Sequence, residues 1–260
     1  MAKYSNFYLI HIQYLGFRFH GWQKQTNAKT LHEMVDKTLW FVLGHENYKT
    51  LGTSRTDAKV SAQHFVFELF LNESLEFEPF FEKLNSNLPS DIRAIDIEEV
   101  DAKFNIIQSS KIKEYHYYFA YGEKAHPYSA AFIKTIPGQL DVPLMKEGAK
   151  LFNGEHRFDK YVTQPKQDTV LVREIIKSEI LDNTEFTASF FPKETFVFKV
   201  SSKGFMRNQV RLMMGQLFEL GKHNITLEEV EKSISDDTDK KALTVIAAAS
   251  GLHLIKVNFD

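Results

Sequence analysis

The feature that most constrains the fold is a succession of strand-like and helix-like segments that occurs twice along the 260 residues. Strand-like segments alternate apolar and polar residues, whereas helix-like segments repeat apolar residues every three or four positions. In the first round we expect strands over 5–14, 62–71 and 92–100 and helices over 31–43 and 79–87. Thr30 followed by Glu33 has the spacing of a capping box and marks the start of the first helix.

The second round begins near residue 105. We expect strands over 109–121, 170–181, 185–191, 195–202 and 252–259 and helices over 143–152, 204–221 and 226–235. Thr226 and Glu229 again have the capping-box spacing. The two rounds predict an α+β fold of two similar halves, 1–104 and 105–260, each a mainly antiparallel sheet with helices on one face.

Composition excludes several kinds of chemistry. The chain has no cysteine, so disulfides, thiolate catalysis and cysteine-ligated zinc are excluded, which fits a reducing cytoplasm. The first residues alternate like a strand without a continuous apolar run, so we expect no signal peptide. No apolar run approaches the roughly 18 residues that a membrane-spanning helix needs, so we expect no membrane partner.

Charge is unevenly distributed along the chain. The formal net charge is −2, which by itself argues weakly against a nucleic-acid partner. Residues 67–101 contain ten acidic and two basic residues, a net charge of −8, and the rest of the chain therefore carries +6. The simpler interpretation of 67–101 is a solvated surface. A separate basic face would also fit, because binding of an anionic partner depends on the local field.

One short stretch, Arg55-Thr56-Asp57, combines a cation and a carboxylate in an expected loop. Asp57 has three possible roles there. It could cap a helix, but the residues after it are strand-like. It could form a structural ion pair with Arg55, or it could be a nucleophile or base that the neighbouring guanidinium keeps ionised. The stretch alone does not decide between the last two roles.

Seven motifs follow one another in a fixed order over nearly the whole chain. They are Tyr14-Leu15-Gly16 with Gly21-Trp22-Gln23-Lys24-Gln25, Ser54-Arg55-Thr56-Asp57-Ala58-Lys59-Val60-Ser61-Ala62, Leu84-Asn85 with Leu88-Pro89 and Asp91-Ile92, Lys113-Glu114-Tyr115-His116-Tyr117, Gly154-Glu155-His156-Arg157-Phe158, Gly204-Phe205 with Val210-Arg211, and Gly251-Leu252-His253-Leu254 with Val257. In these motifs the chain resembles the TruA family of tRNA pseudouridine synthases. Each motif is weak alone, but seven in register are specific.

The resemblance implies an enzyme that isomerises uridine to pseudouridine in tRNA, with a catalytic cleft between the two halves. Asp57 matches the catalytic aspartate, which acts at the sugar as nucleophile or base. Arg55 and Arg211 match arginines that engage this carboxylate and the target phosphate. Tyr115 matches the tyrosine that stacks on the target base and helps to remove its C5 proton.

The same resemblance implies the substrate contacts and the partners. An apolar wall of the pocket is expected from Leu252 or Leu254, and contacts to RNA are expected from Lys24, Gln25, Lys59, Lys203 and Arg207. The expected partner is tRNA, modified in the anticodon stem-loop on its 3′ side, and the expected assembly is a cytoplasmic homodimer. Neither a metal nor an organic cofactor is expected.

Three residues depart from the family pattern, which has glycine, glycine and histidine where this chain has Ser54, Lys59 and Ser61. If the family glycines have a positive φ, serine and especially lysine strain or reshape the loop. These departures leave open a catalytically inactive RNA-binding module of the same fold. Independently of them, a two-domain α+β protein without an RNA partner, in which Arg55 and Asp57 form a buried ion pair, also stays open.

Overall fold

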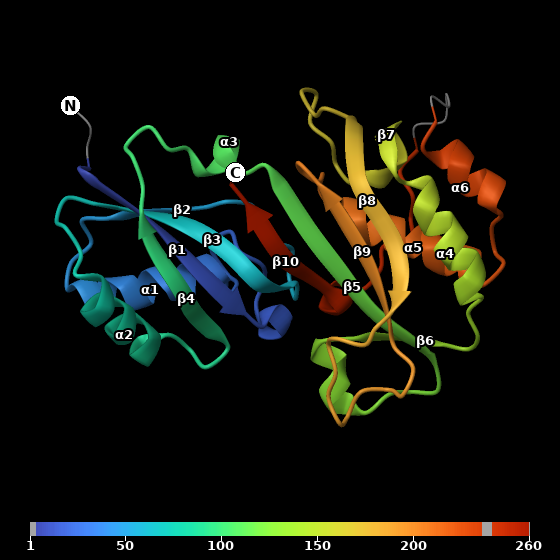
Figure 1. Ribbon diagram of the computed structural model, residues 1–260, viewed down its shortest axis with the longest axis horizontal. Coiled ribbons are helices and arrows are strands. Elements are labelled where there is room, and N and C mark those ends of the chain that lie inside the picture. The colour runs from blue at the N-terminus through green and yellow to red at the C-terminus, as the bar shows by residue number, and fades with distance from the viewer. Residues whose placement is uncertain (1–3, 236–240, 260) are drawn as a thin grey trace. The chain divides into compact units, whose positions relative to one another are not determined.

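The computed structural model describes residues 4–235 and 241–259, and the chain forms two compact units (Figure 1). Unit 1 contains Met1–Lys111 and Leu254–Asp260, and unit 2 contains Ile112–His253. The expected α+β class is confirmed, because the strands are mostly antiparallel and helices pack on them. The division into functional halves at residue 104 stays a prediction.

Unit 1 is built on antiparallel strands in the order β4-β1-β3, with β2 paired to β3. The strands are β1 (Asn6–Tyr14), β2 (Lys49–Gly52), β3 (Ser61–Leu71) and β4 (Ile92–Glu99). Ile10 of β1 lies opposite Phe67 on one side and Ile97 on the other. The last strand of the chain, β10 (Leu252–Asn258), contributes residues 254–258 to this unit, beside β3.

Both faces of this sheet are covered in part. The helices of unit 1 are α1 (Leu31–Leu43), α2 (Phe77–Asn87), α3 (Ile106–Ser109) and the 3-10 helix η1 (Gly16–Arg18). Helices α1 and α2 contact each other (Figure 1). Tyr8 meets Phe77 of α2 edge-on at 5.8 Å, so α2 covers the face of β1 on which Tyr8 lies. On the opposite face, Leu9 packs with Val66 and Ile106.

The ends of α1 agree with the sequence prediction. Thr30 Oγ1 accepts a hydrogen bond from the Glu33 backbone N–H (3.3 Å), and Gly44 ends the helix with φ of +81°. The Glu33 carboxylate accepts from Lys37 (2.6 Å), and this bond, with a weaker one from the Thr30 backbone, lowers the pKa of Glu33. In α6 (Leu227–Ser233) of unit 2, the expected box is complete in both directions.

Unit 2 is built on strands in the order β5-β9-β8-β7, all antiparallel, with the short β6 parallel to β5. The strands are β5 (Ile112–Gly122), β6 (Lys134–Pro137), β7 (Gly154–Arg157), β8 (Val172–Asp182) and β9 (Phe196–Ser202). Sequence periodicity did not predict β2, β6 or β7, because each has four residues and shows hardly two alternations.

The helices of unit 2 form a group in which α4, α5 and α6 contact one another, and α4 also contacts β8. They are α4 (Val142–Leu151), α5 (Gln209–Gly221) and α6, with the 3-10 helices η2 (Pro127–Ala131), η3 (Asp159–Tyr161) and η4 (Ala249–Gly251). Within residues 4–235 and 241–259, every helix is too short or too polar to cross a membrane.

The strand expected over 185–191 is wrong, because this segment is a loop. Phe186 and Phe191 from the loop pack against a buried cluster that includes Tyr118 and Ile133. Apolar residues separated by polar ones resemble a strand in the sequence. Here they anchor an irregular segment to the sheet instead, so the period alone was misleading.

The helix expected from residue 204 begins five residues later, at Gln209. Asn208 has φ of +62°, in the left-handed region, which a continuous right-handed helix does not allow. Asparagine tolerates this conformation better than most residues do. The segment 204–208 is therefore an irregular approach to the helix, and this matters for the site below.

A buried histidine in unit 2 makes stability depend on pH. Nε2 of His253 is 3.0 Å from the Phe132 carbonyl, and burial lowers the pKa of the imidazole to about 4. An unfolded chain has a histidine pKa of about 6.5. The native state takes up this proton only at lower pH. The stabilisation is therefore complete above about pH 6.5 and is lost as the pH falls toward 4.

We expect His253→Gln to flatten this dependence, because glutamine keeps an N–H donor but does not titrate. Between pH 6.5 and 4, the wild type should lose about 3 kcal/mol more of its free energy of unfolding than the variant loses. Urea unfolding followed by circular dichroism at several pH values measures this difference. His20→Gln, at an exposed position, is the control. Parallel curves for wild type and His253→Gln would contradict the prediction.

Candidate active site

Arg55 and Asp57 lie in unit 1 on the loop between β2 and β3. The Arg55 side chain is exposed and Asp57 is half-buried. Backbone hydrogen bonds hold the loop near both ends, from Thr53 N–H to the Val66 carbonyl (3.0 Å) and from Val60 N–H to the Asp57 carbonyl (3.2 Å). The loop therefore presents a guanidinium and a carboxylate from an ordered backbone.

Two glycines let the segment after β1 approach this loop closely. A Cβ on Gly16 would collide with the Val60 carbonyl, and a Cβ on Gly21 would collide with the Thr56 carbonyl. Gly21 also has φ of +84°, which favours glycine. Between the same segments, Trp22 N–H donates to the Thr56 carbonyl (3.2 Å). The glycines of the first motif are thus explained by the loop that they support.

Side chains support the same loop. The Tyr14 hydroxyl and Thr56 Oγ1 form a buried hydrogen bond of 3.0 Å. The Trp22 indole packs on Phe65, with ring centroids 4.2 Å apart. It also lies against Gly52, where a Cβ would be only 2.7 Å from Cε2 of the indole. Because Gly52 directly precedes the loop, the position of the indole and the start of the loop are coupled.

The third motif holds the segment that contains η1. Asp91 forms an ion pair with Arg18, with 2.6 Å between Oδ1 and Nη2, and this bond raises the pKa of the guanidinium. The Asp91 carbonyl also accepts from Leu15 N–H (2.9 Å). Three motifs that are separate in the sequence therefore meet around one loop.

The three departures from the family pattern have different consequences. Lys59 has φ of +69°, and its N–H donates to the Phe19 carbonyl (3.0 Å). Ser54 does not have a positive φ, whereas the buried Ser61 accepts a hydrogen bond from Gly16 N–H (3.0 Å) at Oγ. The strain that we expected is therefore found at Lys59 but not at Ser54.

Tyr115 lies in unit 2 on β5, opposite Val200 of β9. Its side chain is 7% exposed, and its ring meets Phe205 edge-on at 5.3 Å. Tyr117, two residues along the same strand, donates its hydroxyl to the Ala248 carbonyl (2.8 Å), and burial raises its pKa. The Tyr117 hydroxyl is bonded within the fold, so this phenol has a structural role.

Hydrogen-bond acceptors in unit 2 orient the Arg211 guanidinium. Its Nε donates to the Ala247 carbonyl (2.8 Å) and its Nη1 donates to Asn208 Oδ1 (3.0 Å). The Asn208 amide is itself fixed, because its Nδ2 donates to Thr163 Oγ1 (2.7 Å). Contacts to two edges set the plane of a guanidinium, which bidentate binding of an anion requires.

Two of the expected RNA-contacting residues have partners within unit 1. Lys24 forms an ion pair with Asp36 of α1. The Gln25 side chain donates to the His20 carbonyl (2.9 Å) across the loop that leads into α1. Both side chains therefore stabilise this loop, whatever contacts they make with a substrate.

The other three expected RNA-contacting residues are exposed. Lys59 extends from the loop of Asp57 in unit 1. In unit 2, Lys203 is 77% exposed with Glu174 at 3.9 Å, and Arg207 donates to Gln164 Oε1 (2.6 Å). Exposed ion pairs and hydrogen bonds of this kind contribute little to stability, so exchanging them for phosphate contacts costs little.

Leu252 and Leu254 are both buried, the first in unit 2 and the second in unit 1. They follow Gly251, where a Cβ would lie only 2.8 Å from the Tyr118 carbonyl oxygen. The glycine of the last motif is therefore required by the close approach of η4 to β5. Within residues 4–235 and 241–259, no group of three or more histidine, aspartate and glutamate side chains is arranged to hold a metal.

The motifs found the catalytic candidates but missed residues that orient them. Phe205 and Asn208 lie in the Gly-Phe motif, yet nothing in the motif indicated that one packs on Tyr115 and the other binds Arg211. Asparagine before a helical pattern is a usable signal for a left-handed cap. Asp36 carried no signal at all, because it is one of several polar residues on an amphipathic helix.

Comparison with known proteins defines the class. A family model described as tRNA pseudouridine synthase matches residues 149–260. The protein named tRNA pseudouridine synthase A 2 of Bacillus thuringiensis subsp. konkukian is 31% identical over 255 residues, which cover 98% of this chain and all of that protein. The tRNA pseudouridine synthase A of Clostridium botulinum is 31% identical over 246 residues, covering 95% of this chain and 96% of that protein.

The chain therefore belongs to the tRNA pseudouridine synthase A family, and the resemblance drawn from the seven motifs is confirmed. A chain in a crystal structure of a Cbf5–Nop10–Gar1 complex shares 15% identity with a TM-score of 0.33, covering 94% of this chain and 50% of that one. That likeness is too distant to add to the assignment.

We expect Lys59→Gly to increase the free energy of unfolding by about 1 kcal/mol, because glycine adopts φ of +69° without the Cβ repulsion that lysine has. Urea unfolding followed by tryptophan fluorescence measures the effect in unit 1, which contains both tryptophans, Trp22 and Trp40. Lys59→Ala is the matched control, since it removes the ammonium but keeps the Cβ. An alanine variant as stable as the glycine variant would show that strain is not the cause.

Proposed function

We propose that this protein isomerises uridine to pseudouridine in tRNA, the activity that the names of its relatives describe. The observation that carries the proposal is 31% identity over 98% of the chain, in a protein that keeps Arg55 and Asp57 on an ordered loop. The backbone hydrogen bonds of the loop are present despite the strained Lys59. This supports an active enzyme over an inactive module.

The reaction breaks the bond between N1 of the base and C1′ of the ribose, turns the base, and joins C5 to C1′, while C5 loses a proton and N1 gains one. In our proposal Asp57 acts at the ribose as nucleophile or base. Arg55 and Arg211 engage this carboxylate and the phosphate of the target nucleotide. Tyr115 stacks on the base and takes part in removing the C5 proton.

Access to the uridine requires that it leave its helix, at a cost of roughly a few kcal/mol. Contacts to the RNA backbone offset that cost. In the proposal these contacts come from Lys59, Lys203 and Arg207, with Gln25 on the loop before α1. Lys24, which we also expected to contact RNA, forms an ion pair with Asp36 and is assigned a different role below. An apolar wall from Leu252 or Leu254 completes the base pocket, and the functional halves are 1–104 and 105–260.

The assembly and the target region rest on the family resemblance. We propose a homodimer that works in the cytoplasm, with a target on the 3′ side of the anticodon stem-loop. The absence of cysteine is compatible with a reducing compartment. Sedimentation at micromolar concentration tests the dimer, and pseudouridine mapping in tRNA from cells that lack the protein identifies the target.

We expect Asp57→Asn to lower the rate of pseudouridine formation by at least about 10³-fold, because the amide neither attacks nor accepts a proton at the ribose. Affinity for tRNA should change little, since Asp57 is one group among many that contact the RNA. Carbodiimide labelling of the modified tRNA and a filter-binding assay measure the two quantities. Near-normal turnover by Asp57→Asn would refute the proposed role.

Two controls separate the alternatives. Glu46→Gln makes the same change from acid to amide at an exposed site and should keep full activity. An inactive RNA-binding module would bind tRNA without forming pseudouridine even as the wild type. A protein without an RNA partner would not show the salt-dependent binding to tRNA in which affinity falls steeply as the salt concentration rises.

A further inference from the structure

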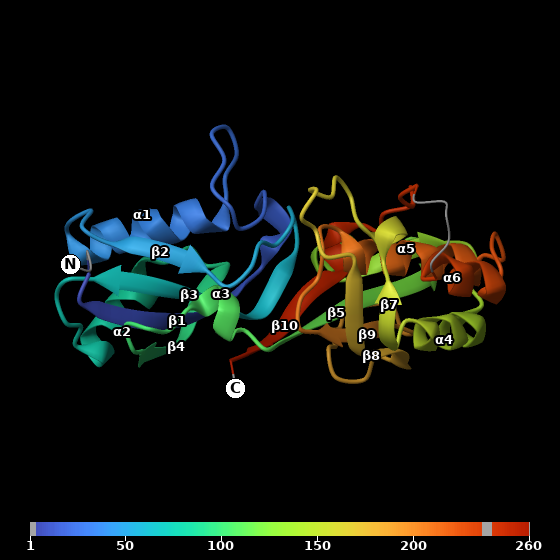
Figure 2. The ribbon, with the colours of Figure 1, turned by 90° about the horizontal axis from the view of Figure 1, so that it is seen from above.

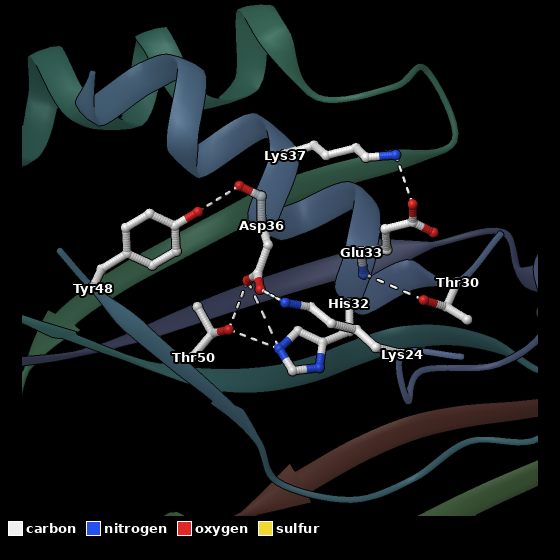
Figure 3. A network of polar contacts seen from close by, with 8 residues as sticks. All are labelled: Lys24, Thr30, His32, Glu33, Asp36, Lys37, Tyr48 and Thr50. Atoms are coloured by element: carbon white, nitrogen blue, oxygen red, sulfur yellow. Dashed lines mark hydrogen bonds and ion pairs between the residues drawn. The ribbon is translucent and has the colours of Figure 1, made fainter. Parts of the chain in front are cut away.

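The carboxylate of Asp36, on α1, is the centre of a polar network in unit 1 (Figure 3). One oxygen accepts from the Thr50 hydroxyl (2.6 Å), and His32 Nε2 is 3.7 Å from the same oxygen. The other oxygen forms the ion pair with Lys24. The Asp36 side chain is only 16% exposed, so its carboxylate is largely shielded from water.

The proton positions in this network follow from its donors. The Thr50 hydroxyl has one proton, which it gives to Asp36, so it must accept from His32 Nε2–H at 2.7 Å. The other ring nitrogen of His32 is buried without a hydrogen-bond partner in the described part of the chain. Burial lowers the pKa of this imidazole, which favours the neutral ring.

This proton order excludes one obvious reading of the group, a catalytic triad. In a triad the hydroxyl donates to the histidine and the carboxylate accepts from the far ring nitrogen. Here the Thr50 hydroxyl donates to Asp36, and the far nitrogen of His32 is not bonded to the carboxylate. The network holds neighbouring segments together and does not activate a nucleophile.

The three partners of the Asp36 carboxylate are all connected to Trp22. Lys24 is two residues beyond Trp22 in the sequence. The His32 ring stacks on the indole, with centroids 5.0 Å apart and planes within 11°. Thr50 is two residues before Gly52, on which the indole rests. One carboxylate therefore fixes the indole through the loop that follows Trp22, through the His32 ring stacked on the indole, and through the strand that ends at Gly52.

Trp22 in turn fixes the loop that carries Asp57. Its backbone N–H donates to the Thr56 carbonyl (3.2 Å), one residue before Asp57. The loop that leads into α1 extends away from the strands of unit 1 (Figure 2), and between Gln25 and Ala28 an isolated backbone bridge closes it. The Lys24–Asp36 ion pair anchors this projecting loop to α1, and its loss would increase the motion of the loop and loosen the position of Trp22.

We propose that Asp36 is a positioning residue for the proposed reaction, on which this inference rests. Through Lys24, His32 and Thr50 it holds Trp22 in place, and through Trp22 it holds the backbone next to Asp57. Lys24 acts in this network as an anchor for the loop rather than as a phosphate contact. Small displacements of a catalytic group lower the rate of reaction far more than they change substrate binding.

The test uses the full-length protein with Trp40→Phe as the parent, so that Trp22 is the only tryptophan. We expect Asp36→Asn to lower kcat for pseudouridine formation by about 10- to 100-fold, with KM for tRNA within about twofold. The emission spectrum of Trp22 should shift in the same variant. Glu33→Gln is the matched control, because it breaks the exposed ion pair with Lys37 on the same helix and should change neither quantity.

Lys24→Met provides a second variant that cannot fail through loss of a core residue, since Lys24 is 49% exposed. If both residues act through one network, the double variant Lys24→Met/Asp36→Asn should be no slower than Asp36→Asn alone. If Lys24 instead contacts a phosphate, its loss would raise KM and reduce the slope of log affinity against log salt by about 1, which would overturn the anchor role.

The remaining outcomes are also decisive. A shifted Trp22 spectrum with unchanged kcat would overturn the positioning role and leave a purely structural network. An active parent with an unaffected Asp36→Asn variant would do the same. A wild-type protein that forms no pseudouridine would refute the proposed function itself, so the two failures are distinguishable.

Discussion

The loop of unit 1 that carries Arg55 and Asp57 depends on a contact between two stretches of backbone with no side chain between them. Gly16 and Gly21 lie against the carbonyls of Val60 and Thr56 so closely that a Cβ at either glycine would collide. Backbone packed against backbone has few rotatable bonds, so a loop held in this way keeps its shape without being a helix or a strand. Tyr14 reinforces the contact with its buried hydrogen bond to Thr56. The exposed Arg55 therefore extends from a rigid base.

Unit 2 orients the side chain of Arg211 by hydrogen bonds rather than by backbone packing, and this arginine too has a fixed position. Arg211 is on the first turn of α5, and its guanidinium bonds the Ala247 carbonyl and Asn208 Oδ1. Asn208 performs two tasks, because its left-handed backbone delays the start of the helix and its side chain connects Arg211 to Thr163. In both units irregular backbone, rather than a helix or a strand, determines where the charged groups are placed.

The sequence predicted the long elements and the catalytic candidates because both leave local signals, namely periods of 2 or 3.6 and motifs of adjacent residues. It failed where the cause is tertiary. Phe186 and Phe191 imitate a strand because they anchor a loop, and Asn208 stops a helix that the apolar pattern extends. The link from Lys24 to Asp36 joins a loop to a helix twelve positions on and follows no motif. Such pairs become visible only in three dimensions.

The last strand has a consequence for how the protein is made. Residues 254–258 of β10 belong to unit 1, where Val257 N–H donates to His64 and Phe259 packs on Phe104. A ribosome therefore releases all of unit 2 before the final strand of unit 1 emerges. Until then β3 lacks its β10 partner along the part of its edge that β2 does not pair, and such an unpaired edge is a site for mispairing. The order of synthesis thus makes unit 1, which carries Asp57, complete only after unit 2, although most of unit 1 is translated first.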